Sequence, residues 1–183
     1  MADWQTSDEG VVVTEVIVRE AQASDAQNLI AFLNCVGKES HFLTLDEAGI
    51  LMTDSQMSDY LTQIAAKDNN AYFLALVGDE IAGVVSLTAD FHERIRHIGD
   101  LFIVVRKEYQ GYGLGQILLA DMLAFVSEVG VIKRLELQVQ KRNEKAIHLY
   151  QKHGFEIETV RKYGARDEQG QLIDVLEMVQ FFD

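Results

Sequence analysis

An almost continuously apolar run, Ile98–Val105, leads into three alternating glycines between Gly111 and Gly115. A run of this kind is typical of a strand that is covered on both faces of a sheet. Beyond the glycines, the apolar residues from Leu118 to Val129 recur at spacings of three and four, which predicts a helix packed on that sheet. The chain is therefore expected to fold around a buried strand, a glycine turn and a packed helix.

The glycine turn has a chemical consequence of its own. A turn that leads into a helix exposes successive backbone amides at the positive end of the helix, and glycines place no β-carbon in the way of a pyrophosphate. We therefore expect an anion site at Gln110–Gly115. The segment lacks the G-x-G-x-x-G of a dinucleotide fold and the Gly-Lys-Ser/Thr ending of a P-loop. A glycine turn without a ligand is the alternative.

Hydrophobic periodicity predicts the remaining elements. Upstream we expect a strand over Val11–Arg19, a helix capped by Ser24 and Asp25, a helix over Ser55–Ala66, and a hairpin of Ala71–Val77 and Glu80–Thr88. Downstream we expect a strand over Arg134–Val139, a helix over about Glu144–His153, and strands from Phe155 and over Leu172–Phe182. The order is strand, two helices, three strands, helix, strand, helix and two strands.

Composition limits the domain count and the compartment. The 183 residues contain no proline and no repeat that would mark a linker, so we expect one domain over 1–183, with 1–10 as a flexible polar tail. The apolar runs are far shorter than the roughly 18 residues that a membrane span needs. Cys35 is the only cysteine, which excludes an intrachain disulfide and favours the cytoplasm. Its apolar neighbours indicate a core residue more than a nucleophile.

Charge limits the class of partner. The chain has 16 basic and 29 acidic residues and a formal net charge of -13, which argues against binding nucleic acid or anionic membranes. The imbalance lies in residues 1–105, so this part would favour a cationic partner. Residues 106–183 are nearly balanced, and their basic clusters could face an anion or form ordinary solvated surface.

The glycine segment resembles the acyl-CoA signature of the GNAT superfamily, Q/R-x-x-G-x-G/A, in which Gln110, Gly113 and Gly115 are matched. Lys107 stands where many members have proline, and the resemblance extends from about Val18 to Phe182. It implies a GNAT-like α+β fold, a mixed and mostly antiparallel sheet flanked by about four helices, and an acetyl-CoA-dependent N-acetyltransferase. It also implies that acetyl-CoA is held by Ile103, Val104 and Val105 and by Gln110, Gly111, Tyr112, Gly113, Leu114, Gly115 and Gln116.

The segment from Asn143 to Phe155 is similar to a second family pattern, N-x-x-A-x-x-x-Y-x-x-x-G-F. Asn143 and Tyr150 fall on one face of a helix, about 10 Å apart along its axis. By resemblance, Asn143 hydrogen-bonds the pantetheine arm, and Tyr150 protonates the departing thiolate of CoA. The alternatives are an ordinary helix cap for Asn143 and a packed core aromatic for Tyr150.

Acetyl transfer to an amine also requires a group that takes a proton from the ammonium. Asp100, Glu93 and His97 are the candidates, and burial inside the apolar run would raise the pKa of Asp100 and make it a better base. Asp100 could equally be a hydrogen-bonded structural carboxylate. His148 and His153 are five residues apart, and no metal-ligand pattern accompanies them, so we expect no metal.

Three functions fit these observations. The first is an acetyltransferase acting on a primary amine, with a polyamine, an amino sugar, an amino acid or a protein N-terminus as the acceptor. The second is a non-catalytic CoA-binding regulatory domain, and the third is an acyltransferase that uses a longer acyl group. The apolar end Met178–Phe182 fits a homodimer contact as well as a last core strand.

Overall fold

The computed structural model describes residues 15–43 and 49–183. In this part of the chain seven strands form one sheet and four α-helices cover it. The strands are β1 (Val16–Glu20), β2 (Ala71–Val77), β3 (Glu80–Ala89), β4 (Ile98–Val105), β5 (Arg134–Gln140), β6 (Glu156–Arg166) and β7 (Leu172–Phe181). The helices are α1 (Ala26–Glu39), α2 (Asp54–Ala65), α3 (Leu114–Val129) and α4 (Glu144–Lys152), with short 3-10 turns at Ala23–Asp25 and Lys107–Tyr109. The predicted element order and the mixed α+β fold class are confirmed.

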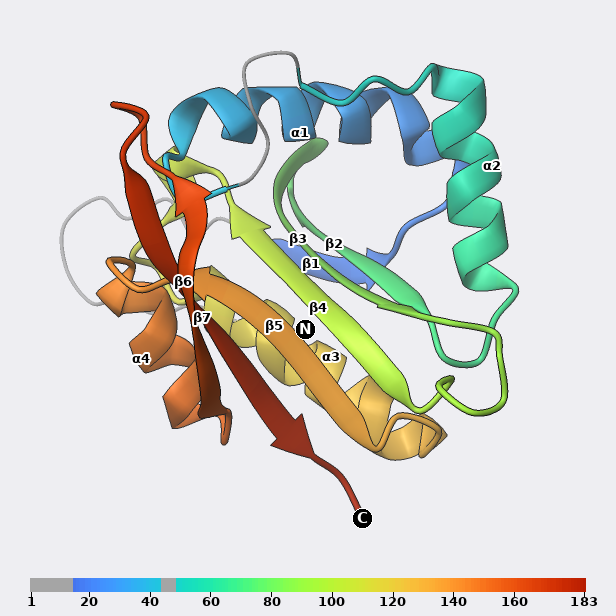
Figure 1. The fold of residues 1–183 in the computed structure, drawn as a ribbon. Coiled ribbons are helices and arrows are strands. Elements are labelled where there is room, and N and C mark those ends of the chain that lie inside the picture. The colour runs from blue at the N-terminus through green and yellow to red at the C-terminus, as the bar shows by residue number, and fades with distance from the viewer. Residues whose placement is uncertain (1–14, 44–48) are drawn as a thin grey trace, which may run out of the picture.

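The sheet has the strand order β1-β2-β3-β4-β5-β7-β6. Neighbouring strands are antiparallel except β4 and β5, which run parallel and pair only from Ile98 with Arg134 to Asp100 with Glu136. Beyond that point the two strands move apart toward their C-terminal ends, as Figure 1 shows. This divergence opens the sheet at its centre.

Two hydrophobic cores lie on the two faces of the sheet. α1 and α2 pack on one face, where Leu29 and Leu61 meet Leu74 and Val84 of the strands. α3 and α4 cover the other face, where Leu118, Leu119 and Met122 are fully buried. Alternate residues of a strand point to opposite faces, so Leu101 of β4 joins the α3 core while Val104 joins the α1 core.

One detail differs from the sequence predictions. The described part of the first predicted strand is β1, which begins at Val16, and residues 11–14, like the predicted tail 1–10, lie outside the described residues. Asp25 does not cap α1 with its side chain, because its carboxylate accepts from the amide of Gln22 and pairs with Arg19 at 2.7 Å. The side chain of Asp25 therefore closes the 3-10 turn that precedes α1. None of the described helices combines the length and the apolar character needed to cross a bilayer.

Candidate active site

A cleft of about 740 Å³ lies where β4 and β5 separate. All the residues predicted to hold acetyl-CoA line this cleft except Tyr112: Ile103, Val104, Val105, Gln110, Gly111, Gly113, Leu114, Gly115, Gln116, Asn143 and Tyr150. Tyr112 is 71% exposed and does not line the cleft. The structure thus gathers two segments distant in sequence around one cavity.

The glycine turn presents its amides to the cleft. Gly111 and Gly113 have positive φ angles of 87° and 82°, a conformation that residues with a β-carbon rarely adopt. The carbonyl of Gly113 accepts the amides of Gln116 and Ile117 and so starts α3. Among the described residues, nothing accepts a hydrogen bond from the amides of Gly111–Gly115. Free amide donors at the positive end of a helix have the arrangement that binds an anion, so the predicted anion site stays a prediction that this geometry fits.

Gln110 fixes the turn to the strand that precedes it. Its side-chain Nε2 donates to the carbonyl of Val105, the last residue of β4, at 2.9 Å. The turn therefore cannot shift along the cleft without breaking this bond.

α4 supplies the opposite wall through Asn143 and Tyr150. The Oδ1 of Asn143 accepts from the amide of Ala146 at 3.3 Å, so the helix-cap alternative is realised. The cap uses only the oxygen of the side chain, and its amide nitrogen finds no acceptor among the described residues. Asn143 can therefore cap α4 and still donate to a ligand in the cleft.

Tyr150 is 7% exposed, and its ring packs edge-on against Phe155 at 5.8 Å. The packed-aromatic alternative thus describes its ring, while the residue still lines the cleft. Burial raises the pKa of Tyr150, so the phenol keeps its proton at neutral pH. A protonated phenol at the cleft wall can donate a proton, and the same burial makes it a weaker acid than a free phenol.

Comparison with known proteins identifies this arrangement. The sequence model of the acetyltransferase (GNAT) family matches residues 42–155. The chain belongs to the GNAT acetyltransferase family. A crystal structure of an acetyltransferase of this family from Streptococcus pneumoniae is 46% identical, with a TM-score of 0.90, over 92% of this chain and 100% of that one. The predicted family and enzyme class are confirmed: the chain is an acetyl-CoA-dependent N-acetyltransferase.

Two curated relatives have named acceptors. The L-amino acid N-acetyltransferase AaaT of Escherichia coli (strain K12) is 28% identical over 126 residues, which cover 67% of this chain and 76% of the relative. The spermidine N(1)-acetyltransferase of the same strain is 32% identical over 103 residues, or 56% of this chain and 54% of the relative. The match thus spans only about half of the spermidine enzyme.

Asp100 of this GNAT acetyltransferase is not buried as expected. It is exposed and is not among the residues that line the cleft, because α1 and α2 cover β2 and β3 but leave this end of the β4 face open. The pKa of Asp100 is nevertheless shifted in the expected direction. Partial desolvation and then the negative charge of Glu136, its partner on β5, raise the pKa of the Asp100 carboxyl.

The other predicted base candidates lie away from the cleft. Glu93 is largely exposed and sits 3.7 Å from Arg96, and His97 precedes β4 without lining the cavity. Cys35 is half-buried, and its thiol donates to Glu39 at 3.4 Å, so it is not a full core residue. Among the described residues, no group of three His, Cys, Asp or Glu side chains could hold a metal.

Sequence reasoning missed part of the cleft wall. Ser40, Phe42 and Leu43, which follow α1, line the cleft, as does Arg142 just before α4. These residues meet only because the connection after α1 crosses to the end of β5, about 100 positions later. The basic cluster at Lys141 and Arg142 was a visible clue, although it fitted a solvated surface equally well.

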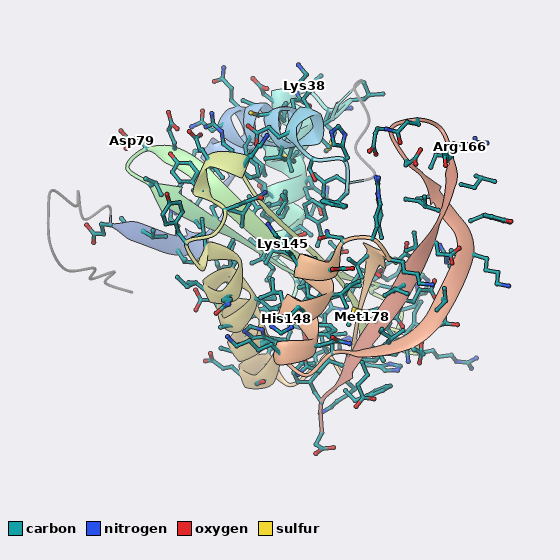
Figure 2. The ribbon with its side chains drawn as sticks, turned by 90° about the vertical axis from the view of Figure 1, so that its left-hand side faces the viewer. Lys38, Asp79, Lys145, His148, Arg166 and Met178 are labelled. Carbon is teal, nitrogen blue, oxygen red and sulfur yellow. The ribbon has the colours of Figure 1, made fainter. Side chains whose placement is uncertain are left out.

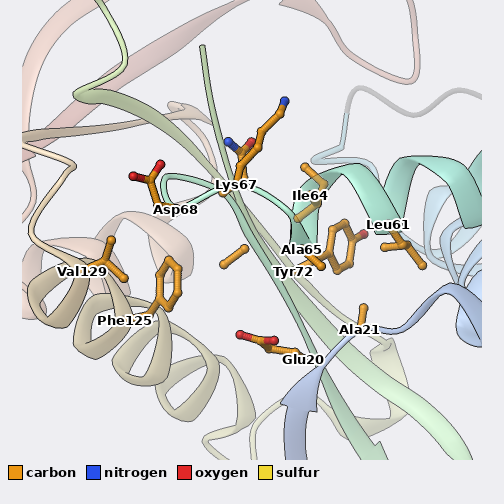
Figure 3. Close-up of a pocket in the computed structure, with 12 residues that line it drawn as sticks. Glu20, Ala21, Leu61, Ile64, Ala65, Lys67, Asp68, Tyr72, Phe125 and Val129 are labelled. Atoms are coloured by element: carbon orange, nitrogen blue, oxygen red, sulfur yellow. The ribbon is translucent and has the colours of Figure 1, made fainter. Parts of the chain in front are cut away.

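A second cavity lies apart from this site and is much smaller, about 140 Å³. Figure 3 shows it between the ends of α2 and α3, lined by Leu61, Ile64, Tyr72, Phe125 and Val129. It contains none of the predicted site residues. The cleft between β4 and β5 is therefore the candidate active site.

Proposed function

We propose that this enzyme transfers the acetyl group of acetyl-CoA to a cationic primary amine at the cleft between β4 and β5. The observation that carries the proposal is the separation of the two strands after Asp100 and Glu136. The resulting cleft has free amides at one end and a buried phenol in its wall. A thioester cofactor needs both an anion site for its pyrophosphate and a proton donor for its sulfur.

Acetyl-CoA would lie along the exposed backbone edge of β4. The residues Ile103–Val105 have no β5 partner, so their backbone groups can pair with the amides of the pantetheine arm. The amides of Gly111–Gly115 would hold the pyrophosphate, and the Nδ2 of Asn143 would donate to the arm from the other wall. No metal enters this arrangement.

The reaction then needs three proton transfers. The nitrogen of the neutral amine attacks the thioester carbonyl carbon, the carbon–sulfur bond breaks, and Tyr150 donates its proton to the departing thiolate. The proton that the new amide nitrogen must lose restores the phenol of Tyr150. Asp100 takes a proton from the acceptor ammonium, through water because it does not line the cleft. Its raised pKa supports this assignment, since a base works best when its pKa is close to the working pH.

Two observations support a cationic amine as the acceptor: the acidic charge of this protein and the substrates for which two of its relatives are named. Asp100 and Glu136 lie side by side near the point where the cleft opens, and the first 105 residues are strongly acidic. A cationic amine would be attracted to such a surface. One relative is named for L-amino acids and another for spermidine, both of which carry amines. We therefore rank polyamines and amino acids ahead of amino sugars.

Two further properties stay predictions. A single domain fits the one continuous sheet of the described residues, and a cytoplasmic location fits the lone Cys35. In the end segment predicted to form either a dimer contact or a core strand, Met178 and Val179 are buried in the sheet while Phe181 is 64% exposed. Only the far end of this segment is therefore open to a second copy.

The proposal is tested by incubating the purified protein with acetyl-CoA and a panel of amines while free thiol is measured. We expect thiol release that depends on the amine and is fastest with cationic acceptors such as spermidine. A preference for acceptors that carry no ammonium group at neutral pH would contradict the acceptor class. Tight acetyl-CoA binding without turnover on any amine would instead favour the non-catalytic alternative. A panel of longer acyl-CoA thioesters with the best amine would test the third possibility.

A further inference from the structure

Arg142 joins three separate segments at one end of the cleft. Its Nε donates to the Oε1 of Gln140 at 2.8 Å, and its Nη2 donates to the carbonyl of His41 at 3.1 Å. Both Nη atoms donate to the carboxylate of Glu168, at 3.2 and 2.7 Å. The guanidinium thus links the connection after α1, the end of β5 and the turn between β6 and β7. We call these four residues the Arg142 cluster.

The Arg142 cluster lies at the same end of the molecule as the start of α4. Figure 2 shows Lys145 at that end of α4 and Arg166, two residues before Glu168, at the upper end of the β6–β7 hairpin. The buried amide of Gln140 adds a second tie, because its Nε2 donates to the carbonyl of His41 at 3.1 Å. The carbonyl of His41 therefore accepts hydrogen bonds from two side chains, that of Gln140 in β5 and that of Arg142 in the turn that follows it.

The cluster also fixes an aromatic wall of the cleft. The guanidinium carbon of Arg142 lies 5.5 Å from the centre of the Phe42 ring, within range of a cation–π interaction. Phe42 is 43% exposed, so core packing alone does not hold it. Together with Ser40 and Leu43 it lines the cleft. The place of this wall therefore depends on the contacts of Arg142.

Fold stability does not explain such a cluster. The side chains of Arg142 and Glu168 are each one-third exposed, and exposed ion pairs contribute little to the free energy of unfolding. What the cluster provides is geometry, because a planar guanidinium can meet a carboxylate, an amide and a carbonyl in fixed directions. A lysine side chain ends in a single ammonium group and cannot make these contacts in fixed directions.

We propose that Arg142 is a positioning residue for the acceptor amine: it holds Phe42 and Leu43 as the wall against which the acceptor binds. This inference rests on the proposed function. The acetyl-CoA contacts proposed above, the edge of β4, the glycine turn and Asn143, receive no hydrogen bond from the Arg142 side chain. The cluster should therefore control acceptor binding and leave acetyl-CoA binding unchanged.

The ion pair is expected to persist under ordinary assay conditions. The Arg142 guanidinium holds the pKa of Glu168 at about 2, well below its usual value. The carboxylate therefore stays charged from mildly acidic to alkaline pH. Because a change of pH in this range does not break the ion pair, a substitution is needed to remove the contacts that hold Phe42 and Leu43.

The test compares Arg142→Lys and Glu168→Gln with the control Arg161→Lys. Arg161 also pairs with a glutamate, Glu177 at 2.8 Å, but does not line the cleft. For the two cluster variants we expect the KM for the acceptor to rise about tenfold, with kcat within about threefold and the Kd for acetyl-CoA within about twofold. The control should match wild type.

Hydrogen exchange supplies a readout that needs no acceptor. We expect faster amide exchange in the peptide that contains residues 40–43 for both cluster variants and unchanged exchange for Arg161→Lys. Faster exchange with an unchanged acceptor KM would overturn the proposal and leave Arg142 a structural tie. An equal loss of acetyl-CoA affinity would overturn it as well. If the wild-type chain acetylates no amine, the proposed function fails, and unchanged exchange would separately show that Arg142 does not hold the wall.

Discussion

Asp100 of β4 and Glu136 of β5 face each other at the last paired position before the two strands separate. Partial desolvation raises the pKa of Asp100, and the negative charge of Glu136 acts in the same direction. Glu136 is compensated by Arg134, with which it forms an ion pair, whereas Asp100 has no cationic partner among the described residues. The relationship explains why Asp100, of the two, is the proposed base.

Replacing Glu136 by Gln should shift the pH dependence of the enzyme. A base must lose its proton to work, so kcat/KM falls as the pH drops through the pKa of Asp100. Removing the neighbouring negative charge lowers that pKa, and the acidic limb of the profile should move to lower pH. Glu158→Gln is the matched control, because Glu158 also pairs with Arg134 but is not opposite Asp100. An acidic limb that moves equally in both variants would remove Asp100 from this role.

Replacing Gly113 by Val should abolish the stabilisation of the protein by acetyl-CoA. The φ angle of 82° strains any β-branched residue, and the added side chain would obstruct the anion site. Gly130→Val is the control, since Gly130 has a φ of 68° at the far end of the same helix. Both variants should melt at lower temperature, but only Gly113→Val should lose the shift induced by acetyl-CoA. An intact shift in folded Gly113→Val would rule out the anion site.

The hydrophobic core beneath the site should lose stability when one of its buried side chains is shortened. Leu118 of α3 is fully buried against the sheet, so Leu118→Ala should lower the free energy of unfolding by about 2–5 kcal/mol. Leu51, which is 86% exposed, provides the control, and Leu51→Ala should change stability by less than about 0.5 kcal/mol. Chemical denaturation measures both. Similar values for the two variants would mean that α3 does not pack as described.

Much of the fold could be predicted because its elements are locally consistent. The bounds of β2 and β4 match their apolar runs, and Gly78, with a φ of 61°, makes the predicted hairpin turn. Asp25 stands at the N-cap of α1 as predicted, but its side chain makes no cap bond because the carboxylate is taken by Arg19 and the Gln22 amide, and only the fold brings Arg19 within reach. Long-range partners of this kind leave no periodic pattern.

The candidate site also has a part that could be predicted from the sequence and a part that could not. The glycine turn has a physical signature and the segment that contains Tyr150 matches a short family pattern, so both could be predicted, and both line the cleft. The burial of Asp100 was mispredicted because an apolar run does not reveal which part of a sheet face lacks a helix. The wall at Phe42 was missed because it depends on contacts with Arg142, 100 positions away.

The most direct test of the account is the turnover of Tyr150→Phe with the best amine acceptor. The substitution keeps the ring and its contact with Phe155 but removes the proposed proton donor, so kcat should fall by about 10²-fold or more. The Kd for acetyl-CoA should stay close to that of wild type. Tyr163→Phe, which alters an exposed tyrosine outside the cleft, should change neither value. Near-wild-type turnover of Tyr150→Phe would contradict the account and leave Tyr150 as a packing residue.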